Sequence, residues 1–134
     1  MALQCLYATR LGDSSPEDSL KFVASEMDEP PLPGAREYCR ELLLATVDVQ
    51  EWAAEIIAGK LENWELSRVT FIDRLILELA LVELVNFDDV PPKVSISEAI
   101  EIAKIYSTDD SPAFINGVLD AIYHDILQGK LSRK

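Results

Sequence analysis

The sequence has few of the residues that hold metal ions. It contains one histidine, His124, and two cysteines, Cys5 and Cys39. No CxxC pair or His/Cys cluster can form from them, which excludes a structural zinc site or an iron-sulfur cluster. Both cysteines fall on apolar faces of predicted helices, where cysteine behaves as a small hydrophobic residue, and a disulfide between them stays open. We therefore expect neither a metal nor a cofactor.

Positive charge is also scarce. Twelve lysines and arginines stand against 24 aspartates and glutamates, and the net charge is -12. This charge repels phosphate backbones at long range and argues against non-specific nucleic-acid binding, so any nucleic-acid role needs a local basic patch. In the absence of a motif, solubility explains the acidity.

Long hydrophobic segments are absent. The longest apolar run, Leu75 to Val85, is interrupted by Glu78 and Glu83 and is far shorter than the roughly 20 residues that cross a bilayer. The N-terminus lacks the basic start and cleavage site of a secretion signal. We expect no membrane association and a cytoplasmic location.

The 134 residues, 49% of them hydrophobic, predict one globular domain, 1-134, without room for a second, catalytic domain. There is no glycine-rich phosphate loop. Acidic pairs such as Asp109-Asp110 lie in predicted loops as solvated charges, and His124 has no nucleophile and orienting carboxylate around it. These observations predict a protein that is not an enzyme.

Every long segment follows the helical period, and none alternates long enough to form a strand, so the sequence predicts an all-α fold. The run after Thr70 is apolar on nearly all sides and should form the most buried helix. The DEPPLPG segment, residues 28–34, contains three prolines and predicts a loop. The predicted helices cover residues 2–11, 16–27, 35–58 (ended by Gly59), 71–87, 96–106 and 112–128.

Several helix starts carry capping signals. Ser15-Pro16 combines a capping hydroxyl with a proline at the first helical position, and Ser111-Pro112 repeats the arrangement. Thr70-x-x-Asp73 resembles a capping box, and Ser95-x-x-Glu98 is a full one. The first helix has no comparable cap. Gly117, inside the pattern FINGVLDAI, suggests the close approach of another backbone.

The segments DRLILELALVEL, VPPKVSISEAIEIAK and DDSPAFINGVLDAI resemble the C-terminal half of the NusB family of transcription antitermination factors. Upstream, ALQCLY at 2–7 and YCRELL at 38–43 resemble the first-helix and third-helix motifs of the family. The resemblance extends from Ala2 to about Ile126. The same domain precedes a methyltransferase in a family of ribosomal-RNA methylases, but this chain has no cofactor-binding glycine motif, so the stand-alone factor is the better match.

The resemblance implies about seven helices in two packed subdomains. It also implies a non-enzymatic protein that binds a boxA-type single-stranded RNA together with the small-subunit ribosomal protein NusE. The heterodimer would join the elongating RNA polymerase complex and suppress termination, notably in ribosomal RNA operons. Some members of the family form a homodimer through the RNA-binding surface. The alternative is a protein-protein interaction module of the same fold with little RNA affinity of its own.

The resemblance also implies a set of site residues. Gln4, Tyr7, Asp110 and Phe114 match positions near the RNA, and Asp73 matches an acidic position that faces the ribosomal protein. Rings stack on unpaired bases, which suits Tyr7 and Phe114 to RNA binding. Helical spacing alone favours a place in the core for both rings; with the resemblance, the core and the RNA surface are equal alternatives.

The chain departs from the family pattern where positive charge is usual. The family has an arginine-rich stretch before the ALQxLY motif, whereas Arg10 is the only basic residue among the first twenty here. Ala113 replaces a common lysine and Pro112 a polar residue. Glu78 replaces a frequent basic residue, although it can pair with Arg74 at i, i+4. RNA binding by the chain alone should therefore be weak and salt-sensitive.

Three explanations of these departures stay open. The true start could lie upstream and supply a basic arm, the chain could be mainly a protein-binding module, or NusE could contribute the positive charge in the heterodimer. The basic residues at the C-terminus, Lys130, Arg133 and Lys134, are expected to form a solvated tail.

Overall fold

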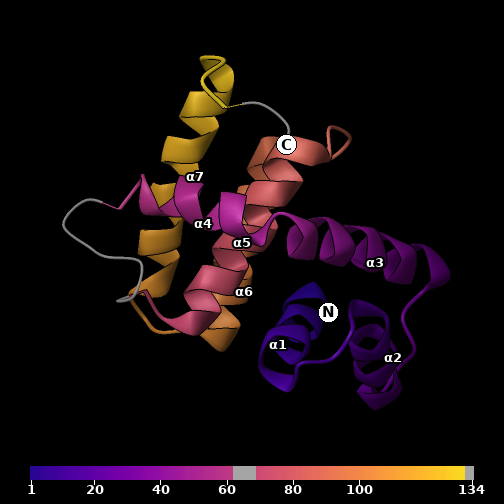
Figure 1. The fold of residues 1–134 in the computed structure, drawn as a ribbon. Helices are drawn as coiled ribbons and strands as arrows, with labels where there is room; N and C mark the ends of the chain where they lie inside the picture. The colour runs from indigo at the N-terminus through magenta and orange to yellow at the C-terminus, as the bar shows by residue number, and fades with distance from the viewer. Residues whose placement is uncertain (62–68, 132–134) are drawn as a thin grey trace. The chain divides into compact units, whose positions relative to one another are not determined.

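A computed structural model describes residues 1–61 and 69–131, and within these ranges it contains seven helices and no strand. The all-α prediction is therefore confirmed. None of the described helices is long and apolar enough to cross a membrane. The helices, labelled in Figure 1, are α1 (Ala2–Gly12), α2 (Pro16–Glu26), α3 (Pro33–Asp48), α4 (Gln50–Ala58), α5 (Phe71–Asn86), α6 (Pro92–Tyr106) and α7 (Ser111–Leu127).

The chain divides into two compact units. The first contains α1, α2 and α3, and the second begins at Val49 and contains α4 to α7. In the first unit each helix contacts the other two. Thr9 Oγ1 donates to Ser19 Oγ at 2.9 Å between α1 and α2, and Arg40 Nε donates to Glu17 Oε1 at 2.7 Å between α3 and α2. The apolar side chains buried in this unit include Leu3, Leu6, Leu20, Val23, Leu42 and Leu43.

The two cysteines meet inside the first unit. Cys5 on α1 and Cys39 on α3 are both buried, and both are free thiols. Two causes raise the pKa of the Cys5 thiol: its hydrogen bond with Cys39 is the larger, and its burial is the second. Both positions support the expectation of small hydrophobic residues, and the open alternative of a disulfide is not realised in this structure.

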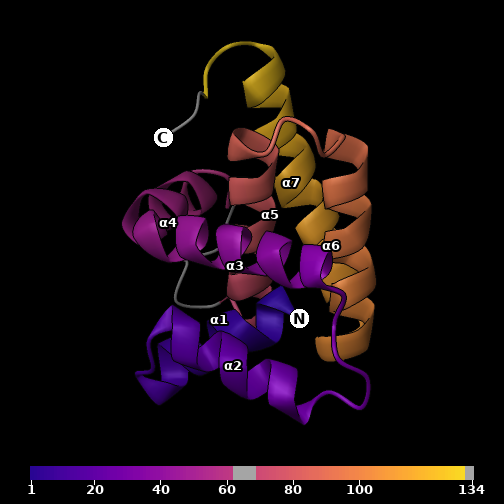
Figure 2. The same ribbon diagram turned by 90° about the vertical axis from the view of Figure 1, so that its right-hand side faces the viewer.

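The second unit is built around α5. This helix contacts α4, α6 and α7, and α6 and α7 also contact each other; Figure 2 shows α5, α6 and α7 side by side. Eleven of the 16 residues of α5 are buried, more than in any other described helix. An apolar surface on all sides leaves no face for water, so the helix takes the central position that its sequence predicts.

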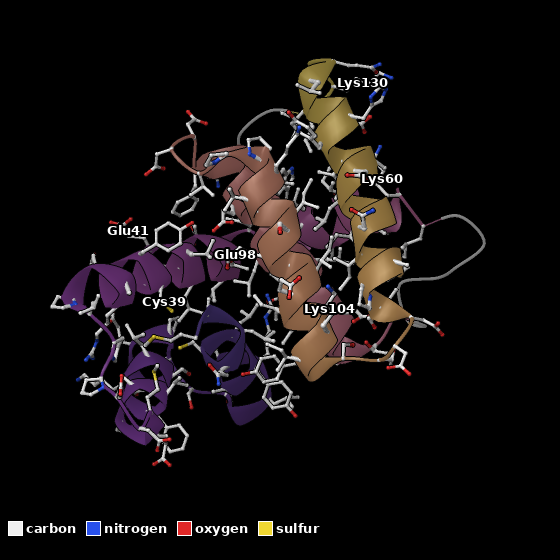
Figure 3. All side chains as sticks on the ribbon, turned by 180° about the vertical axis from the view of Figure 1, so that it is seen from behind. Cys39, Glu41, Lys60, Glu98, Lys104 and Lys130 are labelled. Carbon is white, nitrogen blue, oxygen red and sulfur yellow. The ribbon has the colours of Figure 1, made fainter. Side chains whose placement is uncertain are left out.

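An ion pair links the end of α4 to α7. Lys60, labelled in Figure 3, follows α4, and its Nζ donates to the carboxylate of Asp125. The two side chains are 24% and 21% exposed. This hydrogen bond lowers the pKa of Asp125 from its ordinary value. Of the predicted basic tail, Arg133 and Lys134 lie outside the described residues.

Two predicted N-caps are confirmed. Ser15 Oγ accepts a hydrogen bond from the backbone N–H of Asp18 at 3.1 Å, and Thr70 Oγ1 accepts from the N–H of Asp73 at 3.2 Å. These bonds satisfy N–H groups that have no partner within the helix. The first helix has no side-chain cap at Met1, and α4 ends before Gly59, as expected.

The prediction of one helix over residues 35–58 is wrong. The chain breaks at Val49 (φ -118°, ψ 26°), between α3 and α4. Thr46 Oγ1 donates to the carbonyl of Leu42 at 2.7 Å, a bond to the preceding turn that bends helices. The predicted loop also ends too late, because α3 begins at Pro33. Proline suits this first position, where its missing N–H would have no partner.

The start of α6 also differs from the prediction. The helix begins at Pro92, and the carbonyl of Pro91 accepts from the N–H groups of Val94 and Ser95. Ser95 is buried inside the helix and is not the first residue of a capping box. A proline at the first helical position again explains the earlier start, since its fixed φ suits a helix.

The structure also differs from the predicted start of α7 and from the predicted surroundings of Gly117. The N-cap of α7 is Asp110, and Ser111 is the first helical residue. A Cβ added at Gly117 would meet no heavy atom within 4 Å among the described residues. The predicted close approach of a backbone at Gly117 is therefore wrong.

Candidate nucleic-acid interface

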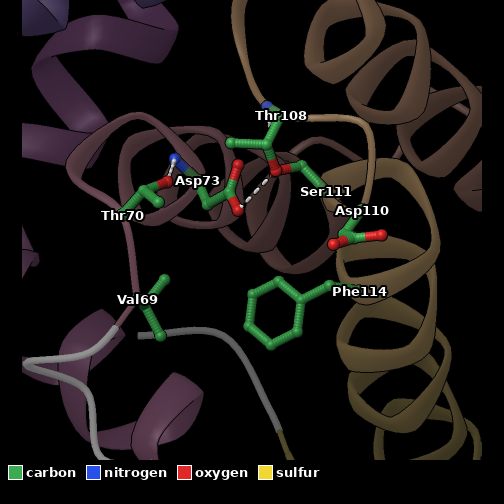
Figure 4. Close-up of a pocket in the computed structure, with 7 residues that line it drawn as sticks. All are labelled: Val69, Thr70, Asp73, Thr108, Asp110, Ser111 and Phe114. Atoms are coloured by element: carbon green, nitrogen blue, oxygen red, sulfur yellow. Dashed lines mark hydrogen bonds between the residues drawn. The ribbon is translucent and has the colours of Figure 1, made fainter.

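An open pocket lies in the second unit, between the start of α5 and the turn that precedes α7 (Figure 4). Its volume is about 340 Å³, at the lower end of the roughly 300 to 1,000 Å³ usual for ligand sites. The pocket can therefore admit one small group. Its lining residues are Val69, Thr70, Asp73, Thr108, Asp110, Ser111 and Phe114.

The ring of Phe114 forms one wall of this pocket. Phe114 lies in the first turn of α7, and its backbone N–H donates to the carbonyl of Asp110 at 3.2 Å. Figure 4 shows the ring projecting from α7 into the pocket, opposite Val69. The side chain is half-buried, so it is held by packing while part of its surface stays accessible. A ring so placed can stack on another planar group.

Asp110 lies at the mouth of the same pocket. It is exposed, and its side chain makes no capping hydrogen bond to α7. Main-chain hydrogen bonds form the turn before α7 instead: the carbonyl of Thr108 accepts from the N–H of Ser111. The structure thus brings Asp110 and Phe114 together, as the family resemblance implies.

Asp73 lines the base of the pocket. Only 5% of its surface is exposed. Oδ1 accepts a hydrogen bond from Ser107 Oγ at 2.5 Å, and Oδ2 accepts from Ser111 Oγ at 2.7 Å. Both oxygens therefore already have partners within the unit. The partner-binding role of Asp73 stays a prediction, and any effect of this residue on a partner would have to pass through the turn that it holds.

Gln4 and Tyr7 lie on α1, in the first unit. Gln4 is exposed, and Tyr7 is 40% exposed. Their spacing of three residues places them on one face of the helix. Tyr7 is thus a surface residue, and the alternative that it belongs to the core does not hold. Their role in RNA binding stays a prediction.

Sequence reasoning missed the hydroxyl groups around the pocket. The sequence pattern predicts Thr70 and Ser111 as helix caps and assigns no role to Ser107 or Thr108. In the structure Thr108 Oγ1 lies 2.8 Å from Ser111 Oγ, and both serines reach Asp73. The cluster of small polar residues in STDDS, just before α7, was the available signal.

Among the residues that the structure describes, the pocket is lined by negative rather than positive charge. Asp73 and Asp110 line it, and none of its seven lining residues is basic. Ala113, where the family commonly has lysine, is exposed nearby on α7. Further along α5, the predicted ion pair of Arg74 and Glu78 is confirmed, with Arg74 Nε 3.5 Å from Glu78 Oε2. Arg74 therefore faces a carboxylate of its own helix.

Within residues 1–61 and 69–131, no group of three His, Cys, Asp or Glu side chains is placed to hold a metal ion. The groups at the pocket are hydroxyls, carboxylates and one ring. Such a set can stack on a planar group and exchange hydrogen bonds with it.

Comparisons with known proteins agree on one family. The family model for the NusB family matches residues 1–124. The chain is 44% identical over 133 residues to the transcription antitermination protein NusB of Salinibacter ruber, covering 98% of this chain and 82% of that protein.

Solved structures give the same result. NusB from T. maritima matches with a TM-score of 0.82 at 34% identity, covering 92% of this chain and 86% of that one. A chain from a crystal structure of the antitermination factors NusB and NusE in complex with dsRNA also matches with a TM-score of 0.82, at 28% identity, covering 92% of this chain and 90% of that one. The chain therefore belongs to the NusB family of transcription antitermination proteins.

Proposed function

We propose that this chain is a transcription antitermination factor that binds a boxA-type single-stranded RNA together with NusE. The heterodimer joins the elongating RNA polymerase complex, notably on ribosomal RNA operons. Residues 1–134 act as a single RNA- and protein-binding domain, without a catalytic step or a cofactor, in the cytoplasm. Family membership and the solved complex of a relative with NusE and dsRNA support this proposal.

The single observation that carries the proposal is the ring of Phe114 in its open pocket. Unpaired bases bind proteins by stacking on aromatic side chains and by forming hydrogen bonds through their edges. Phe114 offers the stacking surface, and the hydroxyls of Thr70 and Thr108 line the same pocket. One base stacked on the ring would fill the space between α5 and α7.

The exposed face of α1 supplies the second set of contacts. Tyr7 offers another ring, and the amide of Gln4 can both donate and accept hydrogen bonds. These groups suit an unpaired base or the sugar-phosphate backbone. Arg10, near the end of the same helix, is the one cation among the first twenty residues.

In this proposal, NusE contributes the positive charge that contacts the RNA phosphates. The chain carries net charge -12, and its pocket contains two aspartates. Each phosphate contact adds to affinity and to its dependence on salt. Because this chain supplies few cations, NusE must provide most of the phosphate contacts, and RNA binding by the chain alone is weak.

A second candidate function is a protein-protein interaction module with little RNA affinity. The acidic lining of the pocket favours it, since Asp73 and Asp110 repel phosphate. The same lining would suit a basic partner protein. A homodimer through the RNA-binding surface stays a prediction.

The stacking role is tested by Phe114→Ala with the chain bound to NusE. Loss of one base-stacking ring should weaken boxA RNA binding by about 1 to 3 kcal/mol. The matched control is Phe22→Ala, which removes the same ring from an exposed site on α2, where the side chain is 62% exposed. Binding is measured by fluorescence anisotropy of labelled RNA, and stability by thermal unfolding.

Three results are distinguishable. Weaker RNA binding by Phe114→Ala, with unchanged NusE binding and the control at wild-type affinity, supports the proposal. Unchanged RNA affinity rejects the stacking role. Wild-type protein that binds NusE but not RNA, at low salt and with NusE present, supports the second candidate function instead.

A further inference from the structure

The loop between α6 and α7 is tied to α5 by one carboxylate. Ser107 is the C-cap residue of α6, and Ser111 is the first residue of α7. Asp73, in the first turn of α5, accepts one hydrogen bond from each of these serines, at 2.5 and 2.7 Å. The two oxygens of a single buried side chain therefore hold both ends of the loop 107–111.

The protons in this cluster can be assigned from the chemistry of the groups. A carboxylate only accepts, and each serine hydroxyl has one proton to give. When both serine protons point to Asp73, the 2.8 Å contact between Thr108 and Ser111 must be donated by Thr108 Oγ1, and the two serine oxygens, 2.9 Å apart, share no proton. The N–H of Thr108 donates to the same Ser111 oxygen at 3.3 Å. The short distances to Asp73 agree with bonds to a charged acceptor, which are the stronger ones.

This cluster joins the two sides of the candidate RNA pocket. Asp110 immediately precedes Ser111, and Phe114 follows it by three residues on the same face of α7. Thr70 caps the helix that carries Asp73. As Figure 4 shows, the bond from Ser111 to Asp73 lies between the segment with Thr70 and the helix with Phe114.

We infer that Asp73, through Ser107 and Ser111, is a positioning residue that holds the α6–α7 turn in the geometry that presents Phe114 and Asp110 to RNA. The inference rests on the proposed function. Asp73 acts through the two serines and does not itself contact the base. Its substitution should change RNA binding even where NusE binding is retained.

The direction in which RNA affinity changes distinguishes a positioning role of Asp73 from a purely electrostatic effect of its charge. Asp73→Asn removes one negative charge near an anionic ligand, which alone would tighten RNA binding. It also replaces one acceptor oxygen by an amide group that donates, so one serine loses its hydrogen bond to residue 73. The inference therefore predicts weaker binding, by roughly tenfold, as expected when one hydrogen bond to a charged group is lost.

The matched control is Glu98→Gln. Glu98 is an exposed residue on α6, labelled in Figure 3, and this change removes the same charge without touching the cluster. RNA affinity is measured with NusE present, well below the melting temperature of each variant. In a Phe114→Ala background, Asp73→Asn should cause little further loss, because the ring that it positions is gone. Independent losses of stability would instead add.

A second readout needs no RNA. Hydrogen exchange of the backbone amides of Ser111 and Phe114, which bond to the carbonyls of Thr108 and Asp110, reports how firmly the turn is held. Asp73→Asn should speed exchange at these amides by roughly tenfold and leave α2, in the other unit, unchanged. If Asp73→Asn does not fold, Ser107→Ala and Ser111→Ala each remove one of the two bonds and take its place.

The outcomes are distinct. Weaker RNA binding that is not additive with Phe114→Ala, together with faster exchange in the turn, supports the inference. RNA affinity that is unchanged or tighter, as for Glu98→Gln, with wild-type exchange in the turn, overturns it. If the wild-type chain with NusE binds no RNA, the proposed function fails, while exchange still decides whether Asp73 holds the turn.

Discussion

Arg74 and Glu78 lie one turn apart on α5, and the Nε atom of the arginine is 3.5 Å from an oxygen of a carboxylate that has no exposed surface. The arginine side chain is 31% exposed. The pair therefore joins a fully buried side chain of α5 to a partly exposed side chain of the same helix. A buried carboxylate is costly when a cation beside it is taken away, because less of its charge is then compensated.

Arg74→Ala should accordingly lower the free energy of unfolding by about 1 to 3 kcal/mol. The double variant Arg74→Met with Glu78→Met should recover most of that loss, since apolar residues of similar size often replace a buried ion pair without penalty. Urea unfolding of both variants checks this. A single variant as stable as the wild type would show that the pair does not compensate Glu78.

The ion pair of Lys60 and Asp125 predicts a dependence of stability on pH. The hydrogen bond from Lys60 lowers the pKa of Asp125 in the folded protein below its ordinary value of 3.8. The stabilisation is therefore present above pH 4 and is lost as the pH falls through the lowered pKa. Asp125→Asn should be less stable than the wild type at pH 7, and the difference should be smaller at pH 2. An equal difference at both pH values would contradict the assignment.

Gly117 offers a simple gain in stability. It lies in the interior of α7, where glycine costs about 1 kcal/mol relative to alanine. A Cβ there meets no described heavy atom within 4 Å. Gly117→Ala should raise the free energy of unfolding by up to about 1 kcal/mol. A loss of stability in thermal unfolding would show that the surroundings of this position are tighter than the structure has them.

Local signals sufficed to predict much of the fold. The hydroxyls of Ser15 and Thr70 cap the helices that they precede, because the orphan N–H groups of a helix start need acceptors close in sequence. The central place of α5 follows from its composition, since an apolar residue on every face demands neighbours on every side. Both features depend on residues within a few positions of one another.

Features that depend on tertiary context could not be predicted in this way. The break at Val49 carries no glycine or proline, and the helical pattern continues through it. Ser111 has the sequence of an N-cap, yet its hydroxyl bonds to Asp73, 38 positions away. Ser95 matches a capping box by its spacing to Glu98, but a proline three residues earlier begins the helix first.

At the candidate site, too, some features could be predicted from the sequence and others could not. The resemblance to a family named Phe114 and Asp110, and the structure places them at one pocket. Spacing alone favours a place in the core for Phe114, whereas its side chain is only half-buried. The link from Asp73 to Ser107 and Ser111 joins α5 to the α6–α7 turn through side-chain bonds, which no periodicity reveals.

Binding of labelled boxA-type RNA, with and without NusE, at several salt concentrations tests the central claim most directly. For single strands, each phosphate contact should contribute about -0.7 to the slope of log affinity against log salt. We expect weak binding by the chain alone and tight binding with NusE, with a clearly negative slope. The chain bound to NusE but showing no RNA affinity at low salt, or an affinity that does not change with salt, would contradict it.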